Sequence, residues 1–263
     1  MARVFITGST DGLGRAAAQS LLNDGHQVVL HARSAERAAA IKALASHSLG
    51  VAVGDLRSAT DVKSIADQVN AVGRMDAVVH NAGVYTEPSR GTTPEGHAGV
   101  LAVNTLAPYM LTALIERPRR LVYLSSGLHR GGQGSLDDLD WTKRRWDPAR
   151  AYAESKLHVV ALAFALAKRW PDVLINAVDP GWARTKMGGA GAPVDIDTGQ
   201  RTQTWLAASD DPAALVSGRY WHHLHQQQQP ASEATDPSFQ DQFIARLQEL
   251  TGVVLPQAQK PPS

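Results

Sequence analysis

Apolar residues in this chain gather in short runs that alternate with longer segments of helical periodicity. The short runs consist mainly of Val, Ile, Leu and Ala, which is typical of strands buried on both faces of a sheet. Six runs predict strands, namely Arg3–Thr7, Gln27–His31, Val51–Gly54, Ala77–His80, Leu121–Leu124 and Leu174–Val178. A seventh strand is expected at Gly218–Trp221.

Ala-rich segments with helical periodicity lie between these runs. They predict helices at Leu13–Leu22, Ala35–Ser46, Ala59–Val72, Glu95–Ile115, Ala151–Trp170 and Phe239–Leu250. The alternation indicates an α/β fold, a Rossmann-like doubly wound parallel sheet of about seven strands with helices on both faces. The chain has 263 residues and no visible repeat or linker, so we expect a single domain over residues 1–263. Residues 236–263 are expected to be a C-terminal extension.

Two connections are unusually long for such a fold. Gly127 to Arg150 joins the fifth strand to the following helix, and Lys186 to Gln200 follows the sixth strand. Long loops inside a compact domain are usually functional. We predict that 186–200 is a substrate lid, with its glycines as hinges. Trp141 and Trp146 of the first connection either line the pocket mouth or anchor that loop. The polar segment His225–Gln229 is expected to be an exposed turn.

Composition and charge limit the kinds of partner and the cellular location that we expect for this chain. Lys plus Arg is 26 and Asp plus Glu is 25, so a net charge of +1 gives no reason to expect nucleic acid or an anionic membrane as a partner. The absence of cysteine excludes disulfides and thiol chemistry. Strand-like sequence begins at Arg3 without a leader, and no apolar run is long enough for a membrane span, so we expect a cytoplasmic protein. His222, His223 and His225 lack matching carboxylates, and no metal is expected.

A glycine-rich turn joins the first strand to the first helix. The turn reads Thr7-Gly8-Ser9-Thr10-Asp11-Gly12-Leu13-Gly14. Glycine permits a tight turn and lets backbone N–H groups approach a pyrophosphate at the positive end of a helix. An ordinary strand-to-helix turn is the alternative. The cofactor-binding residues expected here are Gly8, Ser9, Thr10, Gly12, Leu13 and Gly14.

The end of the second strand indicates which dinucleotide is bound. An acidic residue at this point would bind the ribose hydroxyls of NAD and repel a phosphate, but the sequence has Ala32 followed by Arg33 and Ser34. Because Arg pairs well with phosphate, we predict NADP(H) in preference to NAD(H). Further cofactor contacts are expected after the third and fourth strands, at Asp55, Leu56, Asn81, Ala82 and Gly83.

A tyrosine and a lysine lie one helical turn apart in Tyr152-Ala153-Glu154-Ser155-Lys156. A free phenol has a pKa near ~10, and a positive charge at Lys156 would lower the pKa of the Tyr152 phenol. The pair Ser125-Ser126 stands at the end of a predicted strand. Any one of these motifs is weak by itself. In this order they predict a nucleotide site, a serine that polarises a carbonyl and a tyrosine that donates a proton.

These motifs, together with Asn104 and Pro180-Gly181-Trp182-Ala183-Arg184-Thr185, resemble those of the short-chain dehydrogenase/reductase family, along nearly the whole chain to about Trp221. The segment from Ser126 to Tyr152, with His129 and Asp137-Asp138-Leu139, is similar to the retinol dehydrogenase and protochlorophyllide reductase branch, a shape that some soluble bacterial ketoreductases share. His80 replaces the first residue of the family's Asn-Asn-Ala-Gly, which we expect to affect sheet packing more than chemistry.

The resemblance implies hydride transfer between NADP(H) and a carbonyl or alcohol, most often the reduction of a ketone or aldehyde. Tyr152 would donate the proton, Lys156 would also bind the nicotinamide ribose, and Ser126, which the family pattern favours over Ser125, would bind the substrate oxygen. Asn104 would support a proton-relay water. The resemblance also implies nicotinamide contacts at Pro180, Gly181 and Thr185. Trp182 and Met187 are expected to cover the substrate together with the 186–200 loop, with plain core as the alternative for Trp182.

Two other functions and one question of assembly stay open. Protochlorophyllide reductase shares the Tyr-to-Lys spacing and reduces a C=C bond. A non-catalytic NADP(H) sensor would typically lack the tyrosine or the lysine, and both are present here. Many relatives form dimers or tetramers through the tyrosine-bearing helix. The long segment before Tyr152 could cover that surface, so we predict a monomer or a homodimer.

Overall fold

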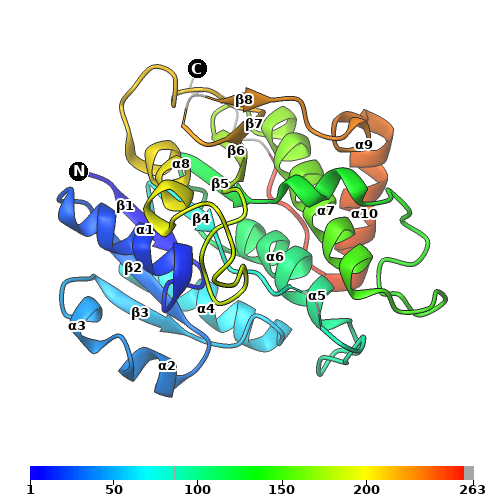
Figure 1. Cartoon of the computed structure of the whole chain (residues 1–263), viewed down its shortest axis with the longest axis horizontal. Helices are drawn as coiled ribbons and strands as arrows, with labels where there is room; N and C mark the ends of the chain where they lie inside the picture. Colours follow the sequence, from blue (N-terminus) through cyan, green and yellow to red (C-terminus); the bar gives the residue numbers. More distant parts are fainter. Residues whose placement is uncertain (86, 225, 258–263) are drawn as a thin grey trace.

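The computed structural model describes residues 1–85, 87–224 and 226–257. In these residues eight strands form one sheet, in the order β3-β2-β1-β4-β5-β6-β7-β8 (Figure 1). Their bounds are β1 Arg3–Ile6, β2 Gln27–Ala32, β3 Gly50–Val53, β4 Ala77–His80, β5 Arg120–Leu124, β6 Leu174–Asp179, β7 Arg219–His222 and β8 Gln227–Gln228. Strands β1 to β7 are parallel, and β8 is antiparallel to β7. The predicted Rossmann-like sheet is therefore confirmed.

The eighth strand is a difference from the prediction, which placed an exposed turn at His225–Gln229. Gln227 pairs with Trp221 and Gln228 pairs with Tyr220, while His225 lies outside the described residues. Both glutamines are exposed, so the pairing uses backbone groups alone. A strand of this kind carries no hydrophobic alternation that a sequence could reveal.

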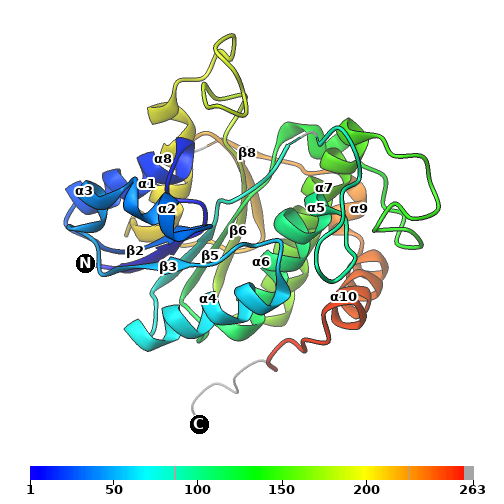
Figure 2. The same ribbon diagram turned by 90° about the horizontal axis from the view of Figure 1, so that it is seen from below.

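Helices cover both faces of the sheet (Figure 2). On one face lie α1 (Gly12–Asn23) and α8 (Ile196–Ala208). On the other face lie α4 (Ala59–Val72), α6 (Ala107–Leu114) and α7 (Pro148–Arg169). The remaining helices are α2 (Ala35–Ala39), α3 (Lys42–Ala45), α5 (Gly99–Leu101), the π-helix η1 (Ala102–Leu106), the 3-10 helix η2 (Gly127–Gly131), α9 (Ser232–Thr235) and α10 (Pro237–Thr251).

Three predicted segments differ from the structure in their internal detail. The helix expected over Ala35–Ser46 is interrupted at Ile41, whose side chain is buried against the sheet. The helix expected from Glu95 begins only at Gly99 and contains the π-helical turn η1. Helix α8 begins inside the predicted lid, because Asp195 accepts a hydrogen bond from the Thr198 N–H and caps the helix. The loop after β6 therefore ends at Asp195.

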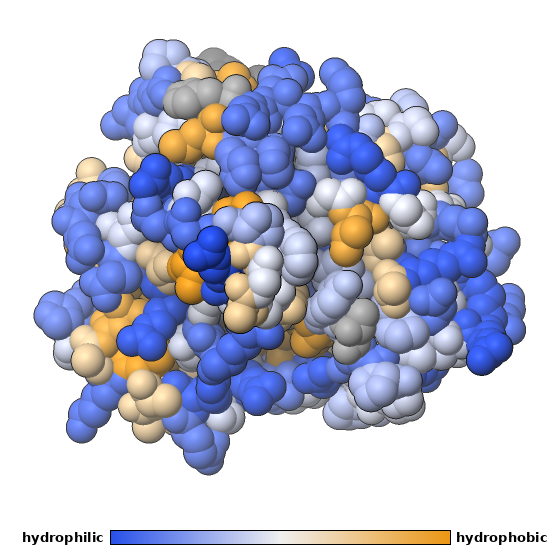
Figure 3. All heavy atoms as spheres, viewed as in Figure 1, coloured by the Kyte–Doolittle hydropathy of each residue, from blue (hydrophilic) through white to orange (hydrophobic). Residues whose placement is uncertain are grey.

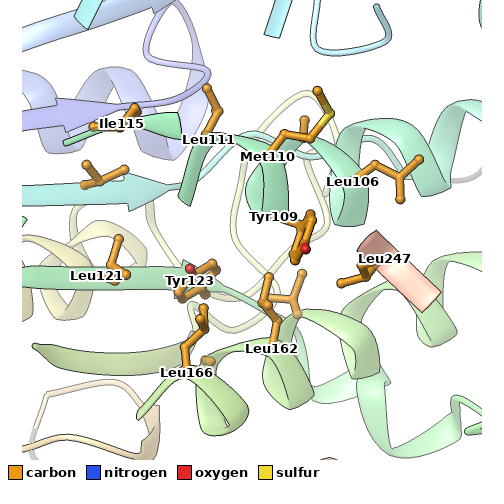
Figure 4. Close-up of a cluster of buried hydrophobic side chains, with 14 of the residues drawn as sticks. Leu106, Tyr109, Met110, Leu111, Ile115, Leu121, Tyr123, Leu162, Leu166 and Leu247 are labelled. Atoms are coloured by element: carbon orange, nitrogen blue, oxygen red, sulfur yellow. The ribbon is translucent and has the colours of Figure 1, made fainter. Parts of the chain in front are cut away.

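The strands bury successive side chains in two separate cores, as the two-residue period of a strand requires. In β1, Phe5 joins the core beneath α4, α6 and α7, whereas Val4 and Ile6 join the core beneath α1 and α8. Figure 4 shows part of the first core, in which Leu106, Tyr109 and Met110 lie near Tyr123 of β5, Leu162 and Leu166 of α7 and Leu247 of α10. Both faces of the sheet are thus occupied by packing, which leaves the carboxyl ends of its strands to carry a site.

Candidate active site

A cleft of about 470 Å³ lies at the carboxyl ends of the central strands, where the strand order reverses between β1 and β4. Open parallel sheets bind ligands at such a position. Of the residues expected from the sequence, the cleft is lined by Gly8, Thr10, Gly12, Leu13, Gly14, Arg33, Asp55, Leu56, Asn81, Ala82, Gly83, Tyr152, Lys156, Pro180, Thr185 and Met187. We call this the cofactor cleft.

The glycine-rich turn is built for close backbone approach. Gly8 has a φ of +66° and Gly12 a φ of +51°, which favour glycine. A Cβ atom at Gly14 would lie 2.3 Å from Asn81 Nδ2 and 2.5 Å from the Gly8 carbonyl oxygen. Asn81 also donates from Nδ2 to the Thr7 carbonyl oxygen at 2.9 Å. The turn therefore leaves the N-terminus of α1 open to a phosphate, and these residues fit a dinucleotide.

A buried histidine that sequence reasoning missed holds this turn. The Gly8 N–H donates to His31 Nδ1 at 2.9 Å, and His31 Nε2 lies 3.0 Å from the Gly54 carbonyl oxygen. Burial lowers the pKa of His31, which suits a neutral ring that accepts at one nitrogen and donates at the other. The hydroxyl of Ser9 accepts from the His31 N–H at 2.8 Å, so it supports the turn and does not line the cleft.

Basic side chains gather at the nucleotide end of the cleft. Arg33, Arg37, Arg57 and Lys186 all line it. Asp11 joins two of them, since its Oδ2 lies 3.5 Å from Arg37 Nη2 and 2.5 Å from Lys186 Nζ. These contacts, with that of Lys186 first among them, lower the pKa of Asp11. Ser34 lies behind the cleft lining and caps α2 by accepting from the Arg37 N–H at 3.4 Å.

Tyr152 and Lys156 project from the first half of α7, where both are buried at 7% and 4% exposure. Lys156 Nζ donates to the Leu124 carbonyl oxygen at 2.8 Å and lies 5.7 Å from the centre of the Tyr152 ring. Burial raises the pKa of Tyr152 to about 12 and lowers that of Lys156 to about 8. Burial therefore dominates the pKa of the phenol, and the contact that lowers this pKa is the hydrogen bond with Ser126. The ring of Tyr85 packs edge-on against Tyr152 at 4.6 Å.

The two serines after β5 point to different partners. Ser125 is buried and lines the cofactor cleft, but its Oγ donates to the Lys156 carbonyl oxygen at 3.0 Å. Ser126 Oγ accepts from the Leu128 N–H at 3.2 Å and hydrogen-bonds the Tyr152 side chain, which acts to lower the pKa of that phenol. The geometry thus brings Ser126, and not Ser125, to the hydroxyl of Tyr152.

Asn104 occupies the π-helical turn η1, and such turns are frequent at functional sites. Its side chain pairs with both backbone groups of Val84, at 2.8 Å and 2.9 Å, and donates to Ser155 Oγ at 2.9 Å. A Cβ atom at Gly83 would lie 3.4 Å from both Asn104 Oδ1 and Lys156 Nζ. Asn104 Oδ1 and Lys156 Nζ therefore face the same side of Gly83.

The long connection between Ser126 and Tyr152 is anchored by charged side chains. Asp138 accepts from the backbone N–H groups of Thr142, Lys143 and Arg144 at 2.7 to 3.1 Å. Arg144 then forms two hydrogen bonds with the buried Glu154 of α7, at 2.8 Å and 3.0 Å. Trp141 and Trp146 pack edge to face at 5.7 Å, and Trp146 donates to the Glu87 carbonyl oxygen. These tryptophans anchor the loop.

The loop after β6 carries the remaining expected residues. Thr185 lies close to Gly12 across the cleft. Gly181 has a φ of +73° and does not line the cleft, and a Cβ atom there would lie 3.1 Å from His223 Cε1. The side chain of Trp182 is 61% exposed and its Nε1 donates to the Gly188 carbonyl oxygen at 2.8 Å, so it is neither buried core nor part of the cleft lining. Sequence reasoning missed Arg37, Lys186 and Tyr85, which no motif marks, and gave no role to Asp11 within the glycine-rich turn.

The described residues contain neither a membrane-spanning helix nor a metal-binding group of side chains. No described helix is both long and apolar enough to cross a membrane. Within the same residues, no three His, Cys, Asp or Glu side chains are grouped so that they could hold a metal ion.

Comparisons with known proteins agree with this arrangement. The profile of the family described as Enoyl-(Acyl carrier protein) reductase matches residues 8–209. The chain is 39% identical to the short-chain dehydrogenase chyC of Penicillium rubens, over 97% of this chain and 100% of that protein. It is 30% identical to human retinol dehydrogenase 13, over 98% of this chain and 87% of that protein. A solved structure of an uncharacterized protein from Mycobacterium Paratuberculosis is 27% identical with a TM-score of 0.82, over 97% of this chain and 95% of that one.

Proposed function

The chain belongs to the short-chain dehydrogenase/reductase family of NAD(P)-dependent oxidoreductases, in its retinol dehydrogenase-like branch, and from this premise we propose that it reduces a ketone or aldehyde with NADPH. The observation that carries the proposal is that Tyr152 and Lys156 lie together in the cofactor cleft, with Ser126 hydrogen-bonded to the Tyr152 side chain. When bound there, NADPH supplies the hydride.

The chain's own groups supply the proton and the polarisation. A carbonyl that accepts a hydride becomes an alkoxide, which needs a hydrogen-bond donor and a proton. Tyr152 is protonated at neutral pH because burial raises its pKa to about 12, so it is in the form that donates. Ser126 hydrogen-bonds the Tyr152 side chain, and we assign to it the binding of the substrate oxygen. Lys156 places a positive charge beside the phenolate that forms.

The preference for NADP(H) is supported by the charges at the nucleotide end of the cleft. Arg33 and Arg37 line it, and the two residues directly after β2 are Arg33 and Ser34, neither of them acidic. Guanidinium groups pair bidentately with phosphate, so they favour a 2′-phosphate over two free hydroxyls. We expect wild-type protein to bind NADPH at least tenfold more tightly than NADH, which corresponds to about 1.4 kcal/mol. Fluorescence titration of Arg33→Ala should remove most of this difference and leave NADH affinity unchanged.

Reduction of a C=C bond is the second candidate, favoured by one observation. The matched family profile carries the description of an enoyl reductase. Against it, the contact between Ser126 and Tyr152 suits protonation of an oxygen. Matched pairs of saturated ketones and enones, tested for NADPH consumption, separate the two reactions. Carbonyl reduction would convert an enone to an allylic alcohol, whereas reduction of the C=C bond would convert it to a saturated ketone.

We further propose that the protein is a cytoplasmic monomer or homodimer. The C-terminal helices support the proposed assembly. Many relatives associate through the tyrosine-bearing helix, and here α9 and α10 pack on that helix, α7. His158 of α7 stacks on Phe243 of α10 at 4.9 Å, and Lys168 donates to Gln240 at 2.9 Å. On the face seen in Figure 3, hydrophilic side chains predominate and apolar ones form separate patches. Gel filtration with light scattering tests the assembly, and a stable tetramer would contradict it.

A further inference from the structure

A buried carboxylate lies close to the catalytic groups and has no role in the chemistry proposed above. Asp179 ends β6 with 7% of its surface exposed. Its Oδ1 accepts from the Gly181 N–H at 2.9 Å, and its Oδ2 lies 3.2 Å from His222 Nδ1. A Cβ atom at Gly127, the residue after Ser126, would be 3.1 Å from Oδ2. Asp179 thus lies directly behind the serine end of the site.

The partners of this carboxylate leave its charge largely uncompensated. The Gly181 N–H is neutral, Tyr220 supplies a hydroxyl hydrogen bond, and the His222 ring is charged only if protonated. Among the described residues, Asp179 forms no ion pair with Lys or Arg. A buried charge without a partner is unfavourable, so another cation nearby would stabilise it.

Lys156 is also a buried charged group whose hydrogen-bond partner is neutral. Its ammonium group is buried, and the one hydrogen bond it donates goes to the neutral Leu124 carbonyl. Burial lowers the pKa of Lys156 to about 8, and the charge of Asp179 opposes that effect. Glu154, the other buried acid of α7, is already paired with Arg144 and Arg150. Leu124, whose carbonyl binds Lys156, pairs with Val178, the residue before Asp179, so the end of β6 brings this carboxylate toward the lysine. Asp179 is therefore the carboxylate that favours the charged form of Lys156.

We propose that Asp179 is a positioning residue that acts through Lys156, as the buried counter-charge that keeps this lysine in its ammonium form beside Tyr152. The inference rests on the proposed function, in which the lysine must be charged. The other titratable or charged groups around Asp179 come from η2, from α7 and from β7 with the residues that follow it, and are His129, Arg130, Tyr152, Tyr220, His222 and His223.

The same charge acts on the tyrosine in the same direction. Asp179 raises the pKa of Tyr152, although less than burial does. Removal of the charge would therefore lower the pKa of Lys156 and that of Tyr152 together. Carbonyl reduction needs both groups protonated, so the alkaline limb of its pH profile reports the combined change.

The test is Asp179→Asn, which removes the charge and keeps an oxygen for the Gly181 N–H. We expect the alkaline midpoint of kcat/KM to move about one pH unit lower, with little change on the acidic side. His222→Asn, which keeps Asp179 charged, is the matched control, and its alkaline midpoint is expected to stay at the wild-type value. A purely structural role for Asp179 would lower activity at every pH without moving the midpoint, and that result overturns the inference.

A second readout does not depend on turnover. In protein labelled with ¹³C-lysine, the Cε signal of Lys156, assigned from its loss in Lys156→Met, should titrate at lower pH in Asp179→Asn than in wild type. Asp179→Ser serves if the Asn variant does not fold, and the same change is expected. An unchanged titration of Lys156 overturns the inference even if the enzyme is active. Absence of any turnover that depends on Tyr152 and Lys156 in wild type would instead contradict the proposed function.

Discussion

Lys156 Nζ donates a hydrogen bond to the carbonyl oxygen of Leu124 at 2.8 Å, across the junction of α7 and β5. This bond fixes an ammonium group at the carboxyl end of a central strand. Because the helix also carries Tyr152 one turn earlier, the strand sets the position of the phenol relative to the cleft. Packing of α7 against the sheet is thereby coupled to the geometry of the proton donor.

Lys156→Met is expected to lower kcat by about 10²- to 10⁴-fold, because it removes the charge beside the proton donor while keeping a side chain of similar length. The cofactor affinity should fall as well, since the proposed ribose contact is lost. Steady-state kinetics and cofactor titration measure the two effects. Lys168→Met is the control, because Lys168 bonds Gln240 outside the cleft. Wild-type kcat in Lys156→Met would rule out its role.

Gly14→Ala is expected to destabilise the fold by about 1–3 kcal/mol and to weaken cofactor binding at least tenfold. A methyl group there would lie 2.5 Å from the Gly8 carbonyl oxygen, so the backbone of the turn must move. Denaturant unfolding and fluorescence titration with NADPH measure the two effects. Gly50→Ala is the matched control, since its Cβ would meet nothing within 4 Å. Equal behaviour of the two variants would show that the turn is not close-packed.

The His97–Asp140 pair should make stability depend on pH. His97 Nδ1 lies 2.6 Å from Asp140 Oδ2, and this contact raises the pKa of His97. A raised folded-state pKa means that its contribution is fully present below the ordinary imidazole value of about 6.5 and is lost as the pH rises through the folded-state value. His97→Gln should therefore be less stable than wild type at about pH 5.5, with a smaller difference at about pH 9.

Denaturant unfolding at these two pH values checks the sign. The exposed His47 provides the control, since His47→Gln should change stability little at either pH. A difference for His97→Gln that grows toward alkaline pH would mean that the pair does not stabilise the fold as an ion pair.

Helix α10 should contribute core packing to the tyrosine-bearing helix. Leu247 is fully buried against the core shown in Figure 4. Leu247→Ala is expected to lower the free energy of unfolding by about 2–5 kcal/mol. Leu215, which is 45% exposed, gives the control Leu215→Ala, whose effect should stay within about 0.5 kcal/mol. Similar effects of the two substitutions would show that α10 is only loosely attached.

The alternating pattern of strands and helices was sufficient to predict the doubly wound sheet, because buried parallel strands are continuously apolar. It did not reveal β8, whose exposed glutamines pair through backbone groups. It also hid the start of α8, since the preceding glycine-rich loop and Asp195 read as one irregular segment. In both places the structure depends on backbone hydrogen bonds that leave no hydrophobic pattern.

In the candidate site, too, some features could be predicted from the sequence and others could not. Gly8, Gly14, Tyr152 and Lys156 could be found from the sequence because their chemistry requires short fixed spacings. Contacts between distant segments could not be found, such as that of Asp11 with Lys186, which are 175 residues apart. The position of Asp179 beside the catalytic groups is likewise set by the alignment of β6 with β5 and β7, which no local motif encodes.

The most direct test of the account is NADPH oxidation with a panel of ketones and aldehydes, compared between wild type, Tyr152→Phe and Tyr109→Phe. Tyr109 is a buried tyrosine whose hydroxyl bonds Val253 and does not line the cleft. We expect turnover in wild type and Tyr109→Phe, and a kcat at least about 10²-fold lower in Tyr152→Phe with NADPH affinity retained. Carbonyl reduction by Tyr152→Phe at the wild-type rate would contradict the central claim that this phenol donates the proton.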